Sequence, residues 1–279
     1  MKELKEYTKD HAYVICIDSD GCAMDTMNIK HFQCFGPCMV KEWQLEKWQD
    51  EILKRWDEIN LFTMTRGINR FKGLALALSE ISEKYRKIDG IAAFRNWAEH
   101  APELSNDALS KAISLNADPI FTKALNWSKA VNASINALPQ ETKKPFPYVD
   151  QALKASHEKA AVAIVSSANK EAVVEEWNRC GLAESVDVMC CQDAGSKAYC
   201  LSRLVELGYP NDHVLMVGDA PGDLAAAESN AVLYYPILVN HEAQSWQEFI
   251  KTVLPAFIHG TYDDIKEIYI EAFKKNLGE

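Results

Sequence analysis

Two aspartates, Asp18 and Asp20, follow an apolar run and are separated by a single residue, with Gly21 next and Asp25 close behind. On an extended segment, side chains two residues apart project to the same side. Crowded carboxylates are costly unless a cation compensates them, and paired carboxylates are common ligands of Mg²⁺. An acid-rich turn after a strand is the structural alternative, because Asp and Gly are frequent turn residues.

A second acidic pair lies at the end of a later apolar run. Gly218 and Asp219 end the run 213–219, and Asp223 follows in the expected first turn of a helix. Asp223 could simply complement the helix dipole, an explanation that does not apply to Asp219. In open α/β sheets, ligands bind beyond the carboxyl ends of the strands. Both acidic pairs therefore lie where a ligand is expected.

Ser166 and Ser167 end the run 161–167, directly before an expected helix. Hydroxyl donors at a helix N-terminus suit an anion, although a serine there can also serve only as the helix cap. Lys197 opens a further helical segment, where a lysine opposes the macrodipole. Such local misfits are typical of functional sites, and the alternative is an exposed lysine at a frayed helix end.

The runs that carry these residues are short, apolar and rich in Val and Ile, as in strands buried on both faces. They span 12–20, 161–167, 186–193, 213–219 and 231–237. Helical patterns at 169–180, 198–207 and 221–228 separate the later runs. The first two of these patterns stop at glycines and the third begins with proline. Alternating strands and helices predict an α/β fold with a doubly wound, mostly parallel, Rossmann-like sheet.

The interval after the first strand is far too long for one crossover and reads as helix after helix. The expected helices are 39–59, 71–85, 91–100, 108–115 after a Ser105 cap, and 121–138 after Asp118-Pro119. A proline-rich segment, 139–148, reads as a return hinge. We expect an α/β core domain from 1–25 and 148–240, and an all-helical inserted domain from 26–147. A tail at 241–279, with two amphipathic helices, is expected to pack on the core.

Composition limits the possible classes. The chain has 279 residues, 48% hydrophobic and 25% charged, as in an ordinary globular protein with room for a second domain. Its net charge of −10 argues against a nucleic-acid partner. No apolar run approaches the roughly 20 residues that a membrane span needs, and no signal peptide is visible. The eight cysteines then read as reduced thiols of a cytoplasmic protein.

Taken together, the four elements occur in one order: Asp-x-Asp, a serine strand end, a lysine at a helix start, and Gly-Asp-x-x-x-Asp. This order resembles the four motifs of the haloacid dehalogenase superfamily. The resemblance covers the expected core, and the helical insertion resembles the superfamily's cap in position and character. Cys22 stands where many relatives have threonine, and Ala220 where many have serine. Neither position supplies an essential charge.

The resemblance implies a role for each motif residue. Asp18 would be the nucleophile that forms an aspartyl phosphate, and Asp20 the acid that protonates the leaving oxygen and then activates water. Lys197 would neutralise charge, and Ser166, with Ser167 beside it, would bind the phosphoryl group. The implied magnesium ligands are Asp18, the backbone carbonyl of Asp20, Asp219 and, directly or through water, Asp223.

The function expected on these grounds is a Mg²⁺-dependent phosphatase acting on a small phosphorylated metabolite. A phosphomutase would use the same core residues and is the alternative. A dehalogenase is less expected, because relatives with that chemistry usually lack a carboxylate at the position of Asp20. A phosphate-sensing binding module is expected to have lost a charged core residue, and none is missing. Neither the substrate nor the oligomeric state can be read from this pattern.

The inserted helical region contains a basic cluster, Arg66, Arg70 and Lys72. If the segment is helical, the two arginines share a face, and such like charges suit an anionic ligand. We expect Arg66, with Arg70, to bind the polar or anionic end of the substrate. The alternative is surface ion pairing with the many glutamates nearby. His31, Cys34 and Cys38 lack a second ligand pair with zinc-like spacing, so no zinc site is expected there.

Overall fold

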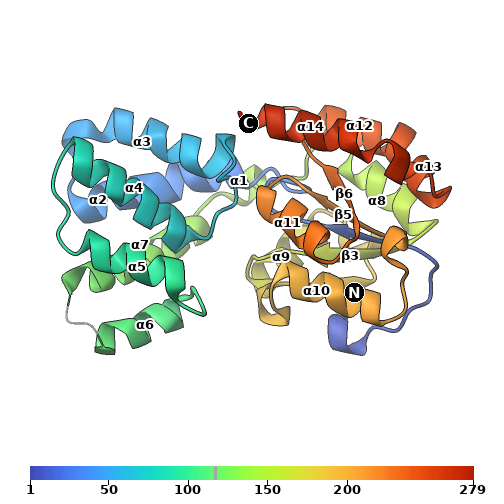
Figure 1. Cartoon of the computed structure of the whole chain (residues 1–279), viewed down its shortest axis with the longest axis horizontal. Helices are drawn as coiled ribbons and strands as arrows, with labels where there is room; N and C mark the ends of the chain where they lie inside the picture. Colours follow the sequence, from blue (N-terminus) through green and yellow to red (C-terminus); the bar gives the residue numbers. More distant parts are fainter. Residues whose placement is uncertain (116–117) are drawn as a thin grey trace. The chain divides into compact units, whose positions relative to one another are not determined.

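The computed structural model describes residues 1–115 and 118–279, which form two compact units (Figure 1). The first unit, here called the core, comprises Met1–Met27 and Glu141–Glu279. The second unit, here called the cap, comprises Asn28–Gln140. Within the described ranges, no helix is both long enough and apolar enough to cross a bilayer.

The core contains one sheet of six parallel strands in the order β1-β4-β3-β2-β5-β6. The strands are β1 Lys2–Glu3, β2 Val14–Ile17, β3 Ala161–Val165, β4 Val188–Cys190, β5 Val214–Gly218 and β6 Leu233–Pro236. Every residue of β2 to β6 is buried, as the apolar runs predicted. The predicted doubly wound parallel sheet is confirmed. Strand β1 was not predicted, because two polar residues carry no pattern.

Helices connect and cover the strands of the core (Figure 1). They are α8 Val149–His157, α9 Lys170–Arg179, α10 Lys197–Glu206, α11 Pro221–Ser229, α12 Glu242–Glu248, α13 Leu254–Ile258 and α14 Lys266–Asn276. Gly181 and Gly208 adopt positive φ angles of 71° and 97°, which explains why α9 and α10 end before them. In the tail, a π-helical turn, Phe249–Val253, joins α12 to α13.

The cap is helical throughout its regular structure. Its α- and π-helices are α1 Met27–Lys30, the π-helix η2 His31–Phe35, α2 Gly36–Trp43, α3 Gln49–Asp57, the π-helix η4 Glu58–Phe62, α4 Arg70–Lys84, α5 Ile91–His100, α6 Asn106–Leu115 and α7 Pro119–Asn136. The two predicted helix N-caps in this unit are confirmed. The Ser105 Oγ accepts a hydrogen bond from the amide of Ala108 at 3.1 Å, and the Asp118 Oδ1 accepts one from the amide of Ile120 at 3.1 Å.

One predicted helix of the cap, 39–59, is wrong. Gln44 takes a left-handed φ of 53° and separates α2 from α3. Trp43 and Leu45 are both buried, yet residues two apart on a continuous helix do not share a face. The break allows both side chains to enter the same apolar cluster, which also holds Trp56 and Trp127.

Candidate active site

Asp18 is the first residue after β2 and lies at the carboxyl end of the sheet. Its backbone amide donates to the carbonyl of Val217 in β5 at 3.0 Å, which continues the pairing of β2 with β5. Gly21 then adopts a φ of 84°, a left-handed conformation that glycine tolerates best, and turns the chain back. Ala23 donates to the carbonyl of Asp18 at 3.3 Å, so the nucleophile candidate sits in a closed turn.

Lys197 is the first residue of α10 and points into this site. The Ser196 Oγ caps the helix by accepting from the amide of Tyr199 at 3.1 Å. The Nζ of Lys197 lies 3.0 Å from the Asp18 Oδ1 and 2.6 Å from the Asp223 Oδ1. Its side chain is only 15% exposed. The alternative of a solvated lysine at a frayed helix end is therefore wrong.

Asp223 is fully buried in the first turn of α11. Its Oδ2 accepts from the amide of Ala220 at 3.1 Å, so it both caps the helix and binds Lys197. A Cβ atom on Gly218 would lie 2.3 Å from the Cγ of Asp223. Glycine at position 218 is thus required for Asp223 to reach the site.

Asp18, Asp219 and Asp223 form the candidate metal centre. Each offers one carboxylate oxygen, and these oxygens lie within 4.8 Å of one another. Burial raises the pKa of Asp18 well above its usual range; Lys197 opposes this rise, and Asp223 and Asp219 add to it. Burial disfavours the charged form of Lys197, but Asp18 and Asp223 outweigh burial, and the pKa of Lys197 is raised. Three carboxylates facing one ammonium suit an added divalent cation.

Asp20 lies outside that group of three carboxylates and is half-buried. Its Oδ1 accepts a hydrogen bond from the Oγ1 of Thr26, a residue that is completely buried. Sequence reasoning missed Thr26, because the turn at Gly21, rather than any regular spacing, brings it back to Asp20. A metal-binding role for the Asp20 carbonyl stays a prediction.

The two serines after β3 differ in their surroundings. Ser166 is 4% exposed, and its Oγ accepts from the amide of Ala168 at 3.2 Å. Ser167 is exposed. Neither caps α9, because the Asn169 side chain accepts from the amide of Ala172 at 3.2 Å and takes that role. Ser166 is consequently the serine that is fixed beside the carboxyl ends of the strands.

Two tryptophans of the core bind the turn that carries Asp18, and sequence reasoning missed both. The Trp177 Nε1 donates to the Oγ of Ser19 at 2.9 Å, and the Trp246 Nε1 donates to the carbonyl of Cys22 at 3.0 Å. The Cys22 thiol, at a position where relatives often have threonine, donates to the carbonyl of Val217 at 3.6 Å. Sequence spacing carries no signal for such contacts, which join residues far apart in the chain.

The predicted basic residues of the cap are not on one helical face, because residues 63–69 form a turn rather than a helix. Arg66 is 2% exposed, and its Nη1 donates to the carbonyl of Leu61 at 2.8 Å. Arg70 begins α4; its Nη1 donates to the Ser128 Oγ at 3.1 Å and to the Asn132 Oδ1 at 2.7 Å. Burial lowers the pKa of Arg70. A substrate contact for either arginine stays a prediction.

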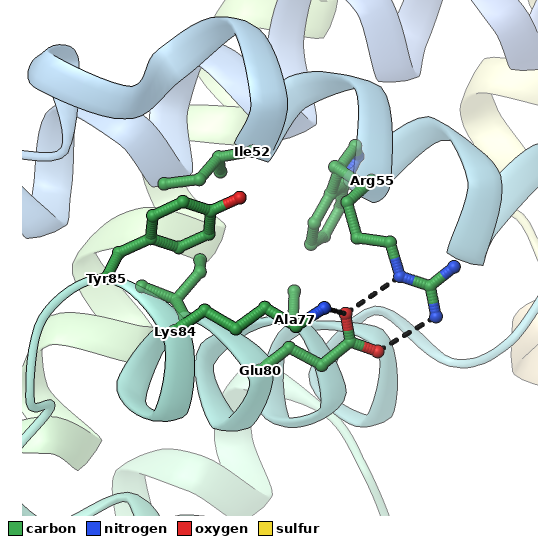
Figure 2. Close-up of a pocket in the computed structure, with 8 residues that line it drawn as sticks. Ile52, Arg55, Ala77, Glu80, Lys84 and Tyr85 are labelled. Carbon is green, nitrogen blue, oxygen red and sulfur yellow. Dashed lines mark hydrogen bonds and ion pairs between the residues drawn. The ribbon is translucent and has the colours of Figure 1, made fainter.

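A pocket of about 200 Å³ lies between α3 and α4 of the cap (Figure 2). Arg55 forms a two-pronged ion pair with Glu80, with N–O distances of 2.8 and 2.9 Å, and Lys84 lies 3.9 Å from the same carboxylate. Figure 2 shows these polar groups on one side of the pocket and Ile52 and Tyr85 on the other. It contains none of the predicted site residues.

Comparison with known proteins places this geometry in a family. The model of the haloacid dehalogenase-like hydrolase family matches residues 86–234, whereas no curated protein matches the sequence. The fold resembles a "putative phosphoglycolate phosphatase" from Lactobacillus delbrueckii subsp. bulgaricus, with 16% identity, a TM-score of 0.54, and coverage of 87% of this chain and 99% of that one. A "putative beta-phosphoglucomutase" from Thermotoga maritima gives 16% identity, a TM-score of 0.52, and coverage of 87% and 99%. The family match covers more than half of the chain, and the protein belongs to the haloacid dehalogenase-like hydrolases, a family of enzymes.

Proposed function

We propose that the protein is a Mg²⁺-dependent phosphatase that hydrolyses a small phosphorylated metabolite through an aspartyl-phosphate intermediate. One observation carries this proposal: the Lys197 ammonium binds both Asp18, at 3.0 Å, and Asp223, at 2.6 Å, inside a buried group of three aspartates. Phosphoryl transfer depends mainly on positioning and on compensation of negative charge, which this arrangement provides.

Asp18 is the proposed nucleophile. Its carboxylate attacks phosphorus, the bond from phosphorus to the ester oxygen breaks, and the phosphoryl group is left on Asp18. Lys197 stays protonated and offsets the charge of the carboxylate and of the phosphoryl oxygens. Ser166 orients the phosphoryl group: its Oγ accepts from the Ala168 amide, so its hydroxyl hydrogen can be donated elsewhere.

Asp20 is the proposed acid and base. It is half-buried, so a proton can be exchanged with the substrate or with water. It first gives a proton to the leaving oxygen, and the resulting carboxylate then takes a proton from the water that attacks the aspartyl phosphate. The hydrogen bond from Thr26 fixes the orientation of the carboxyl group during both steps.

The donor set fits a magnesium ion, because oxygen ligands and excess negative charge are what this cation requires. Asp18, Asp219 and the carbonyl of Asp20 would hold it. The oxygens of Asp223 accept from Lys197 and from the Ala220 amide, so Asp223 would support the ion through water. When bound, Mg²⁺ supplies positive charge to the phosphoryl oxygens during transfer.

The test is a screen of the purified protein against phosphorylated sugars, nucleotides and short acids, with Mg²⁺ and with EDTA. We expect release of inorganic phosphate that EDTA abolishes and Mg²⁺ restores. An isomerised phosphosugar, with no free phosphate, would identify a phosphomutase instead. Phosphate release that persists unchanged in EDTA or in Asp18→Asn would overturn the proposal.

A further inference from the structure

The indole of Trp177 lies on the apolar side of the turn that carries the two proposed catalytic aspartates. It is fully buried in α9, and its Nε1 donates to the Oγ of Ser19, which is also fully buried. We propose that Trp177 is a positioning residue, which acts through Ser19 to hold the carboxylates of Asp18 and Asp20 in place. This inference rests on the proposed function, because it assigns Trp177 a part in the same reaction.

Ser19 is well placed to control both carboxylates. Ser19 lies in the turn between the two aspartates, and its buried hydroxyl binds the indole of Trp177. Its backbone carbonyl accepts from the amide of Met24 at 2.8 Å, while its hydroxyl binds the indole at 2.9 Å. A rotation of the segment about Ser19 would move both carboxylates at once, and the bond to Trp177 resists that rotation.

The polar pair needs an explanation, because it lies in an apolar cluster. Trp177 belongs to the buried apolar cluster of the core that also holds Ile17, Ala23 and Ile164. A hydroxyl and an indole N–H cost free energy there unless they bind each other. Alanine at position 19 and phenylalanine at position 177 would fill this space without burying any polar group that needs a partner. The pair therefore contributes direction rather than packing alone, since a buried hydrogen bond fixes orientation.

The helix that carries Trp177 also begins beside Ser166. The chain runs from Ser166 through the Asn169 cap into α9, and Ser166 receives the amide of Ala168 in that short segment. The helix α9 is thus connected to the proposed phosphoryl-binding serine through the segment before its N-terminus, and to the turn that carries Asp18 through Trp177. A shift of α9 would disturb the distance between nucleophile and phosphorus, on which transfer depends steeply.

A double-mutant cycle tests the contact. We expect Trp177→Phe and Ser19→Ala each to lower kcat by about 10-fold with KM little changed, since displacement of reacting groups affects the transition state. The double variant should be no slower than the slower single variant, because both changes remove the same contact. Tyr7→Phe is the matched control: it removes a buried 2.7 Å hydrogen bond to Tyr209 and a 3.0 Å one to Asp10, and it should lower stability but leave kcat unchanged.

A second measurement does not depend on activity or on metal. The chain has seven tryptophans, and each gives one indole N–H signal in a nitrogen-correlated NMR spectrum. The signal lost in Trp177→Phe identifies Trp177. In Ser19→Ala this signal should move and exchange its hydrogen faster with solvent, whereas Tyr7→Phe should leave it in place.

The outcomes separate this inference from the proposed function. If Asp18→Asn abolishes phosphate release while both single variants keep the wild-type kcat, the positioning role is wrong and the proposed function stands. Losses of kcat that add in the double variant would overturn the route through Ser19. If Trp177→Phe lowers the melting temperature but leaves kcat unchanged, Trp177 contributes only to packing and the positioning role is wrong. Full turnover by Asp18→Asn would instead reject the proposed function.

Discussion

Both units bury aromatic rings, but the core also buries a cluster of carboxylates. The core places Asp18, Asp219, Asp223 and Lys197 in its interior, where they compensate one another only in part. The cap interior is built from aromatic side chains: Trp56, Phe71, Phe94, Phe121 and Trp127. Burial of apolar surface stabilises a unit, whereas unbalanced buried charge does not. The core therefore gives up stability at this carboxylate cluster, whereas the interior of the cap is mainly apolar, with the buried Arg66 bound to the carbonyl of Leu61.

The largest expected effect is the loss of kcat when Asp18 of the core is replaced. Asp18→Asn keeps the shape of the side chain but removes the attacking charge, so kcat should fall by about 10³-fold or more. The variant also removes one of three neighbouring negative charges, so its melting temperature should not fall. Asp150→Asn, which changes an exposed acid on α8 paired with Lys154, is the control and should keep full activity. Turnover that equals wild type in Asp18→Asn would refute the nucleophile assignment.

The next effect concerns proton transfer. Asp20→Asn cannot exchange a proton, so kcat should fall by about 10²- to 10⁴-fold while substrate binding survives. The loss should be smaller for an aryl phosphate, whose leaving group needs no proton, than for an alkyl phosphate. Thr26→Val, which removes the hydrogen bond to Asp20 together with a longer one of 3.5 Å to the carbonyl of Met24, should show the same pattern more weakly. Equal losses for both substrates would argue against the acid role.

A third experiment asks whether the cap selects the substrate. If Arg66 binds the polar end of the substrate, Arg66→Ala should lower kcat/KM for the true substrate by about 10-fold or more. The kcat/KM for an aryl phosphate, which lacks that polar end, should hardly change. Arg66 also donates to the carbonyl of Leu61, so the melting temperature must be recorded beside the rates. Lys72→Ala is the control, an exposed cation six residues along. Equal losses for both substrates, with a lower melting temperature, would leave Arg66 a structural role only.

The smallest effect is on cap stability. Asp57 ends α3, and burial raises the pKa of its carboxyl to about 6. A raised acid pKa favours the protonated form in the folded state, so its contribution to stability is lost as pH rises through about 6. The free energy of unfolding of Asp57→Asn should therefore exceed that of the wild type by about 1 kcal/mol at pH ~7.5 and by almost nothing at pH ~4.5. Thermal unfolding of both proteins at the two pH values measures this, and an equal shift at both would contradict it.

Sequence reasoning succeeded where a residue's role depends on its place along a strand or at a helix start. The parallel sheet, the places of Asp18 and Asp219 after strands and of Lys197 at a helix start, and the helix caps at Ser105 and Asp118 were predictable because the underlying patterns are local. It failed at Gln44, where the helix is interrupted because Trp43 and Leu45, two residues apart, are both buried in the same apolar cluster. It also missed Thr26 and Trp177, because their partners are set by a turn and by packing, which no periodicity records.

The position of the cap in the chain has a consequence for folding during synthesis. Strand β2, which carries Asp18, pairs with β3 and β5, and Val14 lies opposite Ala161 and Val214. The central strand must therefore wait until most of the chain has left the ribosome. The two ends of the insertion meet at the bridge between Met24 and Pro145. A cap that folds first would bring these ends together and shorten the effective loop, so that closing the sheet costs less entropy.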